Sequence, residues 1–412
     1  MSIAQHVLIV GGGLAGPCLA LSLARQGIRS TIFELRSGPS DSGGSISFGP
    51  DALRVLDKHA GVYDKLKVEG YAYDRMTMYF EDGSKLGQVL VAEEGEDGYP
   101  AIRIMRSSVQ KVLLDAVKEK VHLINMKFDA RISKIEEGET GVTALFEDGS
   151  QVNGDILVGA DGIHSKVREH VLDAEAPKPI FTKTQVVNGF IPATSAVKPS
   201  PDFTFPAFVV TPSGIFMTLP IDAAGKTLTW GITTSAIERT RVGWAEYEKS
   251  GEAIKAAKQD FDDIQTEPVR SLLDNVDESQ ARVWAPYSIP TLPRWHTERV
   301  CLIGDAAHAL EPNGQGSAIA FQDAALLSRF IASNPSSSSY GQVFKRFEEL
   351  RKPKVAEVSK NSKPASALKS KTGPWVWFLK KWAMWGFFTW NNGTLRMHKG
   401  PRYDVDEVDL AL

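Results

Sequence analysis

The sequence predicts an α/β fold. A domain built on a parallel sheet is interrupted by an inserted domain with an antiparallel sheet, and a helical segment follows at the C-terminus. Three observations support this. The chain opens with a strand–helix–strand pattern, its middle part alternates β-prone runs with turn residues, and the opening pattern returns near residue 300. At 412 residues the chain also exceeds the size at which one core usually stops growing.

The composition is that of an ordinary globular protein, with 42% hydrophobic and 24% charged residues. A formal net charge of −3 gives no basic surface for nucleic acid. The two cysteines, Cys18 and Cys301, lie in apolar runs, so we expect buried, unreactive thiols in a reducing, cytoplasmic environment. The first apolar run leads straight into a glycine turn, which leaves no room for a signal peptide.

The first strand–helix–strand unit is defined by its periodicity. Residues 6–10 form a continuous apolar run, as in a buried parallel strand. Residues 15–26 carry apolar side chains at helical spacing and end before Gly27, and residues 30–34 form the next strand.

A glycine-rich turn joins this first strand to its helix. Gly11 permits a tight turn, Gly13 lets the backbone approach a pyrophosphate, and Gly16 lets the helix pack closely on the strand. The first helical amides, at Leu14 and Ala15, offer N–H groups to phosphate.

An acidic residue completes the unit. Glu34 ends the second strand 18 residues after Gly16, where its carboxylate can accept hydrogen bonds from ribose hydroxyls. The unit predicts a Rossmann-like dinucleotide-binding domain and disfavours a 2′-phosphate at this position. It leaves FAD and NAD open.

Two hairpins share the turn sequence Glu-Asp-Gly-Ser. One follows residues 76–80 and the other follows residues 143–146, and Asp-Gly between β-prone runs is a strong hairpin signal. We place the first in the inserted domain and the second in a small appended sheet. Longer strands are expected between 179 and 289, with a more polar helical stretch near 242–275.

Two further motifs decide the nucleotide. Residues 155–168 read DILVGADGIHSKVR, and residues 301–318 read CLIGDAAHALEPNGQGSA. Together with the glycine turn, they resemble the three fingerprints of the group A FAD-dependent monooxygenases. This is the para-hydroxybenzoate and salicylate hydroxylase type, which includes tetracycline-inactivating and fungal tailoring enzymes of secondary metabolism. The resemblance covers residues 5–365 and implies non-covalent FAD.

The resemblance implies roles for individual positions. Asp305 matches the aspartate that bonds the ribityl chain of the flavin, and Asp161 matches a motif tied to both FAD and NAD(P)H. Arg106 matches the arginine that precedes an FAD-contacting helix. With the glycine turn, this predicts FAD contacts at Gly11, Gly13, Leu14, Ala15, Gly16, Glu34, Gly44, Arg106, Asp161, Gly304, Asp305, Pro312, Gly316, Ser317 and Ala318.

The change of strand pattern along the chain sets the predicted domain boundaries. The FAD-binding domain would be discontinuous and would hold an inserted substrate domain. The predicted FAD-binding domain spans 1–75, 100–178 and 290–365, the substrate domain 76–99 and 179–289, and the C-terminal helical segment 366–412.

The sequence departs from the family pattern at two positions. Leu35 stands where an arginine often follows the ribose acid, and Gln322 stands where many members have glutamate. Asp161 is also expected to cap the helix near Ser165. His308 is expected to shape a loop rather than to act as a base. No catalytic acid or base and no metal-ligand cluster is identified.

The resemblance implies a reaction. NAD(P)H reduces the flavin, O2 adds at C4a, and the distal oxygen of the C4a-hydroperoxyflavin passes to a small aromatic or polycyclic substrate. Hydroxylation, epoxidation, Baeyer–Villiger insertion and rearrangement all remain open, as does NADH against NADPH. The chain has no second glycine fingerprint for NAD(P)H, so we expect transient binding near Asp161 and Arg168. Strands near 203–231 are expected to form the substrate wall, with candidates Phe208, Phe216, Met217 and Trp230, although core packing is the more common role for such residues.

Other functions remain as alternatives. A flavin oxidase or reductase that never inserts oxygen is one, and a non-catalytic flavin-binding scaffold is another. A flavin-dependent halogenase is disfavoured, because the tryptophan pair at 375 and 377 lacks the Ile-Pro that completes that family's motif.

The Trp-rich segment 374–390 is shorter than the roughly 20 apolar residues of a membrane-spanning helix, and two lysines interrupt it. We expect a helix packed on the body of the protein, with peripheral contact to a membrane surface as the second interpretation.

Overall fold

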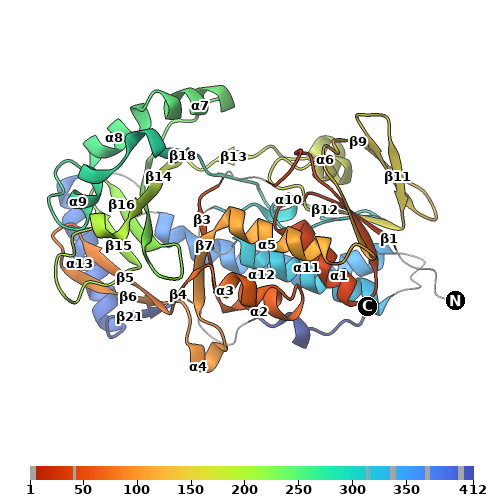
Figure 1. Cartoon of the computed structure of the whole chain (residues 1–412), viewed down its shortest axis with the longest axis horizontal. Coiled ribbons are helices and arrows are strands. Elements are labelled where there is room, and N and C mark those ends of the chain that lie inside the picture. The colour runs from red at the N-terminus through yellow and green to blue at the C-terminus, as the bar shows by residue number, and fades with distance from the viewer. Residues whose placement is uncertain are drawn as a thin grey trace.

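The computed structural model describes residues 6–39, 43–311, 314, 316–334, 340–366, 372–397 and 403–412. Two large sheets dominate this part of the chain and lie toward opposite ends of its long axis, with helices between and around them (Figure 1). One sheet is parallel and contains the N-terminal strand, whereas the other is mostly antiparallel. The predicted α/β fold is confirmed.

The parallel sheet has five strands in the order β20-β12-β1-β2-β8. Their bounds are β1 (His6–Val10), β2 (Arg29–Phe33), β8 (Ile124–Lys127), β12 (Ile156–Gly159) and β20 (Val300–Leu302). Leu8 of the central strand pairs with Thr31 on one side and Leu157 on the other, and all four pairings are parallel. The sheet therefore joins segments that are up to about 300 residues apart in the sequence.

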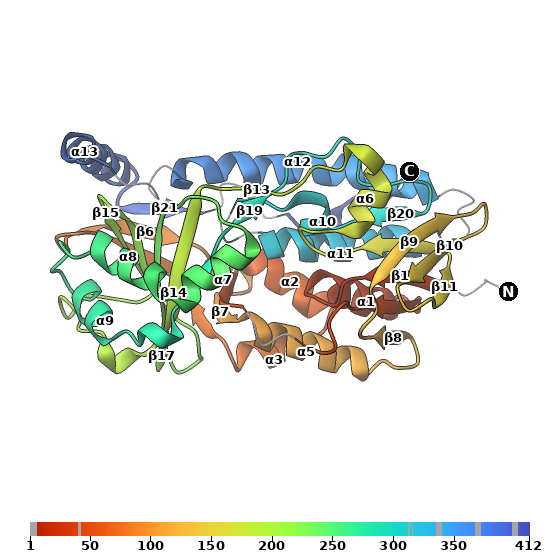
Figure 2. The same ribbon diagram turned by 90° about the horizontal axis from the view of Figure 1, so that it is seen from above.

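Helices pack side by side next to this sheet. Helix α1 (Ala15–Arg25) contacts α5 (Arg106–Lys118) and α11 (Gly316–Ser333). Helix α11 also packs on α2 (Pro50–Lys58) and on α12 (Tyr340–Ser366), which runs the length of this half of the molecule (Figure 2). Both cysteines are free and buried, as predicted, and burial raises the pKa of the Cys18 thiol to about 12.

A three-stranded antiparallel sheet is appended to the parallel one. It consists of β9 (Ile132–Glu137), β10 (Val142–Phe146) and β11 (Gln151–Gly154), and the ring of Phe146 lies 4.6 Å from that of Phe33 in β2. The chain then returns through β12 to α6 (Lys166–Leu172). The predicted hairpin after residue 146 is confirmed, since β10 and β11 pair antiparallel.

The second large sheet has eight strands in the order β18-β14-β17-β16-β15-β5-β6-β21. One face is covered by a core that includes Val187, Phe216, Trp230 and Phe261. The hairpin predicted after residue 80 is confirmed as β5 and β6. The strand bounds are β5 (Arg75–Phe80), β6 (Lys85–Leu90), β14 (Thr184–Pro192), β15 (Ala207–Thr211), β16 (Gly214–Pro220), β17 (Thr227–Ser235), β18 (Arg282–Trp284) and β21 (Thr394–Arg396).

Shorter elements complete the fold. The polar stretch predicted to be helical forms three helices, α7 (Arg241–Lys249), α8 (Glu252–Asp260) and α9 (Val269–Asn275), of which α8 and α9 contribute to the core just described. A small sheet has the strand order β3-β7-β4, and its strands are interleaved along the chain with strands of the two large sheets. It comprises β3 (Ser45–Phe48), β4 (Tyr71–Tyr73) and β7 (Ala101–Met105); the remaining elements are α3 (Tyr63–Lys67), α4 (Glu94–Asp97), α10 (Asp305–His308), β13 (Ile180–Phe181) and β19 (Tyr287–Ser288).

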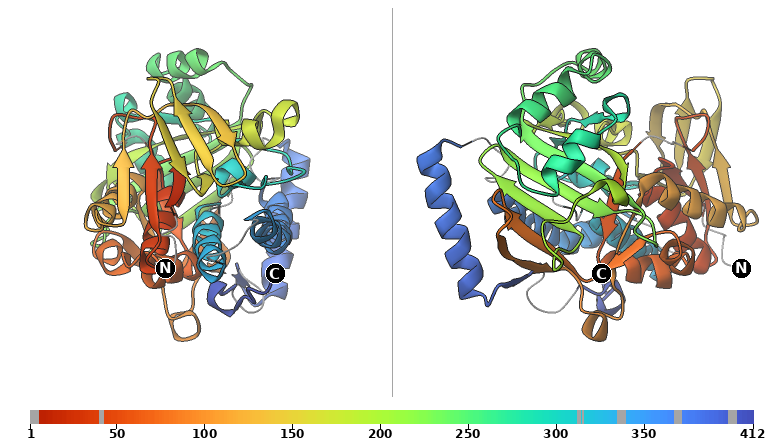
Figure 3. Two further views of the ribbon diagram at one scale, coloured as in Figure 1. Left: turned by 90° about the vertical axis from the view of Figure 1, so that its right-hand side faces the viewer. Right: turned by 60° about the vertical axis from the view of Figure 1, so that its left-hand side comes forward.

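Helix α13 (Pro374–Trp390) packs on the protein through one side only. Trp377 and Phe388 are buried against Phe80, Leu86 and Val210 of the eight-stranded sheet. Most of its remaining large apolar side chains are exposed, and the right-hand view of Figure 3 shows the helix at the edge of the molecule. The expectation of packing is therefore confirmed for one face of the helix.

None of the helices among the described residues is both long and apolar enough to cross a membrane.

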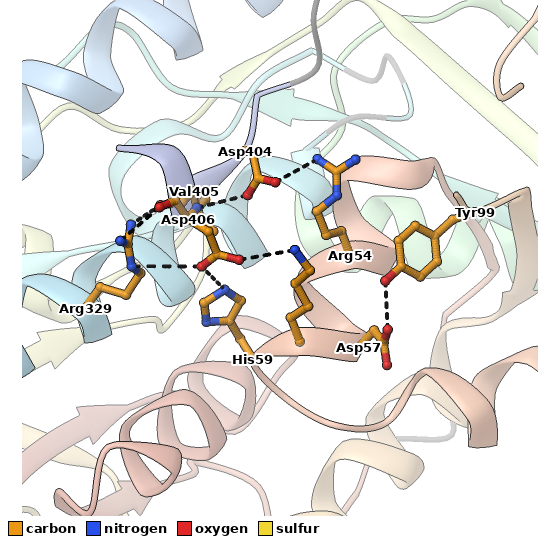
Figure 4. A network of polar contacts seen from close by, with 9 residues as sticks. Arg54, Asp57, His59, Tyr99, Arg329, Asp404, Val405 and Asp406 are labelled. Carbon is orange, nitrogen blue, oxygen red and sulfur yellow. Dashed lines mark hydrogen bonds and ion pairs between the residues drawn. The ribbon is translucent and has the colours of Figure 1, made fainter. Parts of the chain in front are cut away.

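The C-terminal tail, residues 403–410, returns to the parallel-sheet half of the protein. Figure 4 shows how it is held by polar contacts. Asp404 pairs with Arg54 of α2 at 3.3 Å, and Asp406 pairs with His59 at 3.0 Å. Arg329 of α11 donates to the carbonyls of Val405 and Asp406. The tail thus ties α2 to α11.

A buried ion network lies beneath the loop after β20. The carboxylate of Asp323 in α11 accepts from the Gly304 N–H at 2.9 Å, contacts His308 Nε2 at 2.5 Å and accepts from Arg351 Nε at 2.7 Å. Asp323 and Arg351 are both 0% exposed. Although burial opposes ionisation, the charges of His308 and Arg351 hold the pKa of Asp323 down at about 2. The network therefore fixes α10 and α12 to the same helix, α11.

The network predicts non-additive losses of stability. Asp323→Asn leaves the Arg351 guanidinium buried without its carboxylate, and Arg351→Met removes the main cation from a buried carboxylate. Each should reduce the free energy of unfolding by about 3–5 kcal/mol, because an unpaired buried charge is costly. The double variant should lose much less than the sum of the two, as measured by denaturant unfolding of the FAD-loaded protein. Additive losses would show that the two groups are not coupled.

Candidate functional site

The turn between β1 and α1 has no room for side chains at two of its glycines. Gly11 has a φ of +115°, and a Cβ there would lie 2.3 Å from the carbonyl oxygen of Ala160. A Cβ at Gly16 would lie 2.0 Å from the carbonyl oxygen of Gly11. Helix α1 begins after Leu14 and has no side-chain cap, so its first amides are available to an anion. The geometry is that of a phosphate cradle.

The Glu34 carboxylate lies directly beside this turn. It is 5% exposed; its Oε2 accepts from the Gly12 N–H at 2.7 Å and its Oε1 from the Arg36 N–H at 3.0 Å. The Arg36 guanidinium lies 3.6 Å from Oε1, whereas Leu35 is exposed. Each carboxylate oxygen can accept a second hydrogen bond, so the group retains capacity for a ribose diol.

Arg106, the first residue of α5, lies between two loops of the site. Its N–H donates to the Gly44 carbonyl at 3.1 Å, and a Cβ on Gly43 would lie 3.4 Å from its Cδ. A Cβ on Gly13 would lie 3.8 Å from its Nη2. Burial lowers the pKa of Arg106, as does Arg36, while the charges of Asp305 and Glu34 raise it. The Arg106 guanidinium therefore interacts electrostatically with Asp305 and with Glu34, which are both predicted FAD contacts.

The loop after β20 approaches the start of α1. Gly304 has a φ of +58°, and a Cβ there would lie 3.1 Å from the Cβ of Ala320 and 3.6 Å from that of Ala15. Asp305 follows as the first residue of α10. Asp305 is exposed, yet desolvation by the surrounding protein raises the pKa of its carboxyl, against the lowering effects of His308 and Arg106.

The beginning of α11 lies close to the same loop. Gly316, Ser317 and Ala318 form its first turn and are partly exposed, one turn before the Ala320 that faces Gly304. Pro312 lies outside the described residues. The predicted contacts from Gly11, Glu34, Gly44, Arg106, Asp305 and α11 therefore surround one continuous region of the parallel-sheet half.

Asp161 caps a helix, as expected. Its carboxylate accepts from the Ser165 hydroxyl at 2.6 Å and from the N–H of Lys166 at 2.7 Å. Burial raises the pKa of this carboxyl, and these hydrogen bonds lower it. With a third hydrogen bond from the Val167 N–H at 3.2 Å, these contacts occupy the side of the carboxylate that faces α6.

Transient nicotinamide binding near Asp161 and Arg168 stays a prediction, but the Arg168 side chain itself is buried and offers no surface for it. Arg168 is 3% exposed, and its guanidinium donates to the carbonyls of Ala306 at 3.1 Å and Ile163 at 2.5 Å. It therefore holds α10 against the loop before α6. His308 is also buried and bonded to Asp323, which agrees with the expected structural role.

One face of the eight-stranded sheet turns toward the Gly43–Gly44 loop, which we call the flavin loop because Gly44 is a predicted FAD contact. Asn188, Gly231, Met217 and Phe208 pair in register across four neighbouring strands and so share that face. A Cβ on Gly44 would lie 3.9 Å from the Asn188 Oδ1. Of the four predicted wall residues, Met217 and Phe208 are on this face and partly exposed. Phe216 and Trp230 point the other way into the core.

The sequence analysis did not single out Arg103 of β7. Its Nη1 donates to the Ser47 hydroxyl at 3.1 Å and its Nη2 to the Ser45 hydroxyl at 2.8 Å. Desolvation lowers its pKa to about 10, and its Nε is buried without a hydrogen-bond partner. No carboxylate in the described part of the chain forms an ion pair with it. A partly buried guanidinium whose charge has no carboxylate partner is energetically costly. Arg103 is therefore suited to bind an anionic group of a ligand.

A family model described as an FAD binding domain matches residues 4–362. The 3-amino-4-hydroxybenzoate 2-monooxygenase PtmB3 of Streptomyces platensis is 30% identical over 365 residues, covering 87% of each chain. The 6-hydroxynicotinate 3-monooxygenase of Pseudomonas fluorescens is 26% identical over 389 residues, covering 91% of this chain and 94% of that one.

The fold is also found among solved structures. Klebsiella pneumoniae HpxO, crystallised with FAD and uric acid, superposes with a TM-score of 0.79 at 21% sequence identity. The alignment covers 95% of this chain and 96% of that one. The matched FAD binding domain spans most of the chain, and the named relatives are monooxygenases. The chain therefore belongs to the FAD-dependent monooxygenases of the group A type, and its cofactor is FAD.

Proposed function

We propose that this monooxygenase uses NAD(P)H and O2 to insert one oxygen atom into a small aromatic or polycyclic substrate that carries an anionic oxygen. The observation that supports it most is the position of the flavin loop, whose Gly44 lies next to Asn188 on the open face of the eight-stranded sheet. The monooxygenases named above act on hydroxybenzoate and hydroxynicotinate derivatives, which agrees with such a substrate. When bound, FAD supplies the redox chemistry with the reductant and O2.

In this proposal FAD lies in an extended pose along the described cradle, bound non-covalently. Glu34 accepts from the adenosine ribose, the amides of Leu14 and Ala15 bind the pyrophosphate, and Asp305 accepts from the ribityl hydroxyls. The proposed FAD-binding domain comprises 1–75, 100–178 and 290–365, and the proposed substrate domain comprises 76–99 and 179–289. The positive end of the α11 dipole then stabilises negative charge on the reduced ring.

The substrate would lie between the flavin loop and the eight-stranded sheet. Phe208 and Met217 present apolar surface there, which excludes water from the reacting atoms. Asn188 supplies a polar group on the same face. Arg103 binds the anionic oxygen of the substrate and orients the ring, as a guanidinium with free donor capacity can do.

The hydride donor would bind transiently. The sequence has no second glycine fingerprint, which supports binding of the nicotinamide on a surface that is not built as a nucleotide fold. Substrate binding can then gate flavin reduction. The two free, buried thiols agree with a reducing, cytoplasmic location for this chemistry.

Asp305→Ala should weaken FAD binding about 10- to 150-fold, because a hydrogen bond to a charged group contributes about 1.5–3 kcal/mol. Titration of the apo-protein with FAD measures this directly, with the exposed Asp202→Ala as control. Acid precipitation of the wild type should release all of its flavin. Equal FAD affinity for Asp305→Ala and wild type would refute the assignment, and flavin retained by the precipitate would refute non-covalent binding.

Arg103→Met should weaken the binding of aromatic carboxylates about 10- to 100-fold while leaving FAD affinity unchanged, because a charge-assisted hydrogen bond is lost. The measurement is the change in flavin absorbance on titration with 3-amino-4-hydroxybenzoate, 6-hydroxynicotinate and salicylate. Arg103→Lys should recover part of the affinity, and the corresponding amides should bind weakly to the wild type. A wild type that binds acids and amides equally contradicts the anion site, and lost FAD affinity would assign Arg103 to the flavin instead.

A substrate identified in this way should accelerate flavin reduction by NAD(P)H, measured as loss of flavin absorbance in anaerobic stopped flow. With labelled O2, mass spectrometry should find one labelled oxygen in the product. Acceleration without labelled product would identify a flavin oxidase or reductase. Reduction that is equally fast with and without the substrate would remove the gating step.

A further inference from the structure

Helix α13 exposes more large apolar side chains than any other described helix. Trp375 and Trp390, near its two ends, are 83% and 88% exposed. Between them the exposed apolar side chains are Val376, Phe378, Leu379, Trp382, Trp385 and Phe387. Monomeric proteins in water rarely leave an apolar patch of this extent uncovered, so the outer surface of α13 fits a partner.

The inner side of α13 is fixed to the protein. The Trp377 indole N–H donates to Glu81 Oε1 at 2.9 Å, and Lys381 pairs with Asp82 at 2.6 Å. The ring of Phe388 packs directly on the backbone of Gly87. A Cβ at position 87 would lie only 2.1 Å from that ring, so the contact requires glycine there. These contacts set the rotation of the helix about its axis, so the exposed side chains face outward as one surface.

The outward surface covers an unusually wide arc. At about 100° per residue, Trp385 and Phe378 lie on one flank, Val376 on the other, and Leu379 near the middle, which together span roughly 200° of the helix circumference. Charged side chains are absent from this arc of the described helix, because Lys381 lies on the inner side and Lys380 at the border. A single partner helix covers a stripe of about 100°, so a second copy of the chain packed through α13 would leave much of the arc in water.

We propose that α13 lies in the surface of a lipid bilayer, with this outer arc among the upper acyl chains. A bilayer covers the whole arc at once, whereas a single partner helix does not. Tryptophan prefers the boundary between headgroups and acyl chains, and α13 has five, at positions 375, 377, 382, 385 and 390. The helix has 17 residues and is about 25 Å long, shorter than the roughly 30 Å hydrocarbon core, and its anchored inner side holds it parallel to the surface.

The attraction is apolar rather than electrostatic. Lys381 is neutralised by Glu81 and Asp82, and the protein carries a net charge of −3. Binding should therefore occur on zwitterionic lipid and should persist at high salt, where the attraction of exposed cationic residues to anionic lipid is screened.

The test uses the full-length, FAD-loaded protein and vesicles of dioleoylphosphatidylcholine. The wild type should float with the vesicles in a density gradient at low and high salt. The double variant Trp382→Glu/Trp385→Glu should partition at least about tenfold more weakly, since two large apolar groups leave the lipid. The matched control is Trp284→Glu, which changes an equally exposed tryptophan on strand β18 and should bind as the wild type does. FAD content and melting temperature establish that all three proteins are folded.

Three results would overturn the proposal. One is a wild type that stays in solution at saturating lipid. Another is a Trp382→Glu/Trp385→Glu variant that binds vesicles as tightly as the control. The third is a wild type that is dimeric by light scattering, becomes monomeric in the double variant and does not float, which would assign the surface to a second copy. Quenching of tryptophan fluorescence by brominated lipid, present in the control and reduced in the double variant, would support insertion of α13 itself.

Discussion

The carboxylate of Asp323 is the interaction on which the arrangement of the cofactor site depends. Because it is fully buried, it must be paired, and its partners come from three segments: the Gly304 amide, the His308 imidazole and the Arg351 guanidinium. The Gly304–Asp305 turn is consequently held against Ala15 at the start of α1. The backbone of one fingerprint thus contacts the helix of another, although they are about 290 residues apart in the sequence.

The local elements of the fold could be predicted because they depend on periodicity and on turn residues. Both hairpins with Asp-Gly turns and the opening strand–helix–strand unit lie where the pattern indicates. The pairing of buried charges could not be predicted. Asp323 lies in an apolar helical run and Arg351 in a charged one, and neither shows its partner before the helices pack. The burial of Arg168 could not be predicted for the same reason, since an arginine in a loop motif does not reveal its burial.

The two faces of the eight-stranded sheet have different surroundings. One face packs Phe216 and Trp230 into a core. Because side chains alternate between the two faces of a strand, these two residues cannot line a ligand site on the opposite face. The other face meets the flavin loop near Asn188 and carries α13 above Gly87 at the opposite end. A lipid-bound α13 would place this face near the membrane surface. The cationic guanidinium of Arg103, which we propose binds the anionic oxygen of the substrate, and the apolar residues Phe208 and Met217 would suit an amphipathic molecule.

We propose that FAD extends from Glu34, past the α1 amides, to Asp305 beneath the open face of the eight-stranded sheet. A crystal structure of the FAD-loaded protein tests this most directly. We expect ribose hydroxyls within hydrogen-bonding distance of Glu34, the pyrophosphate at the amides of Leu14 and Ala15, and the ribityl chain on Asp305. The flavin ring should lie between the Gly43–Gly44 loop and Asn188. Density for FAD elsewhere, or a ring separated from the eight-stranded sheet by intervening protein, would contradict the account.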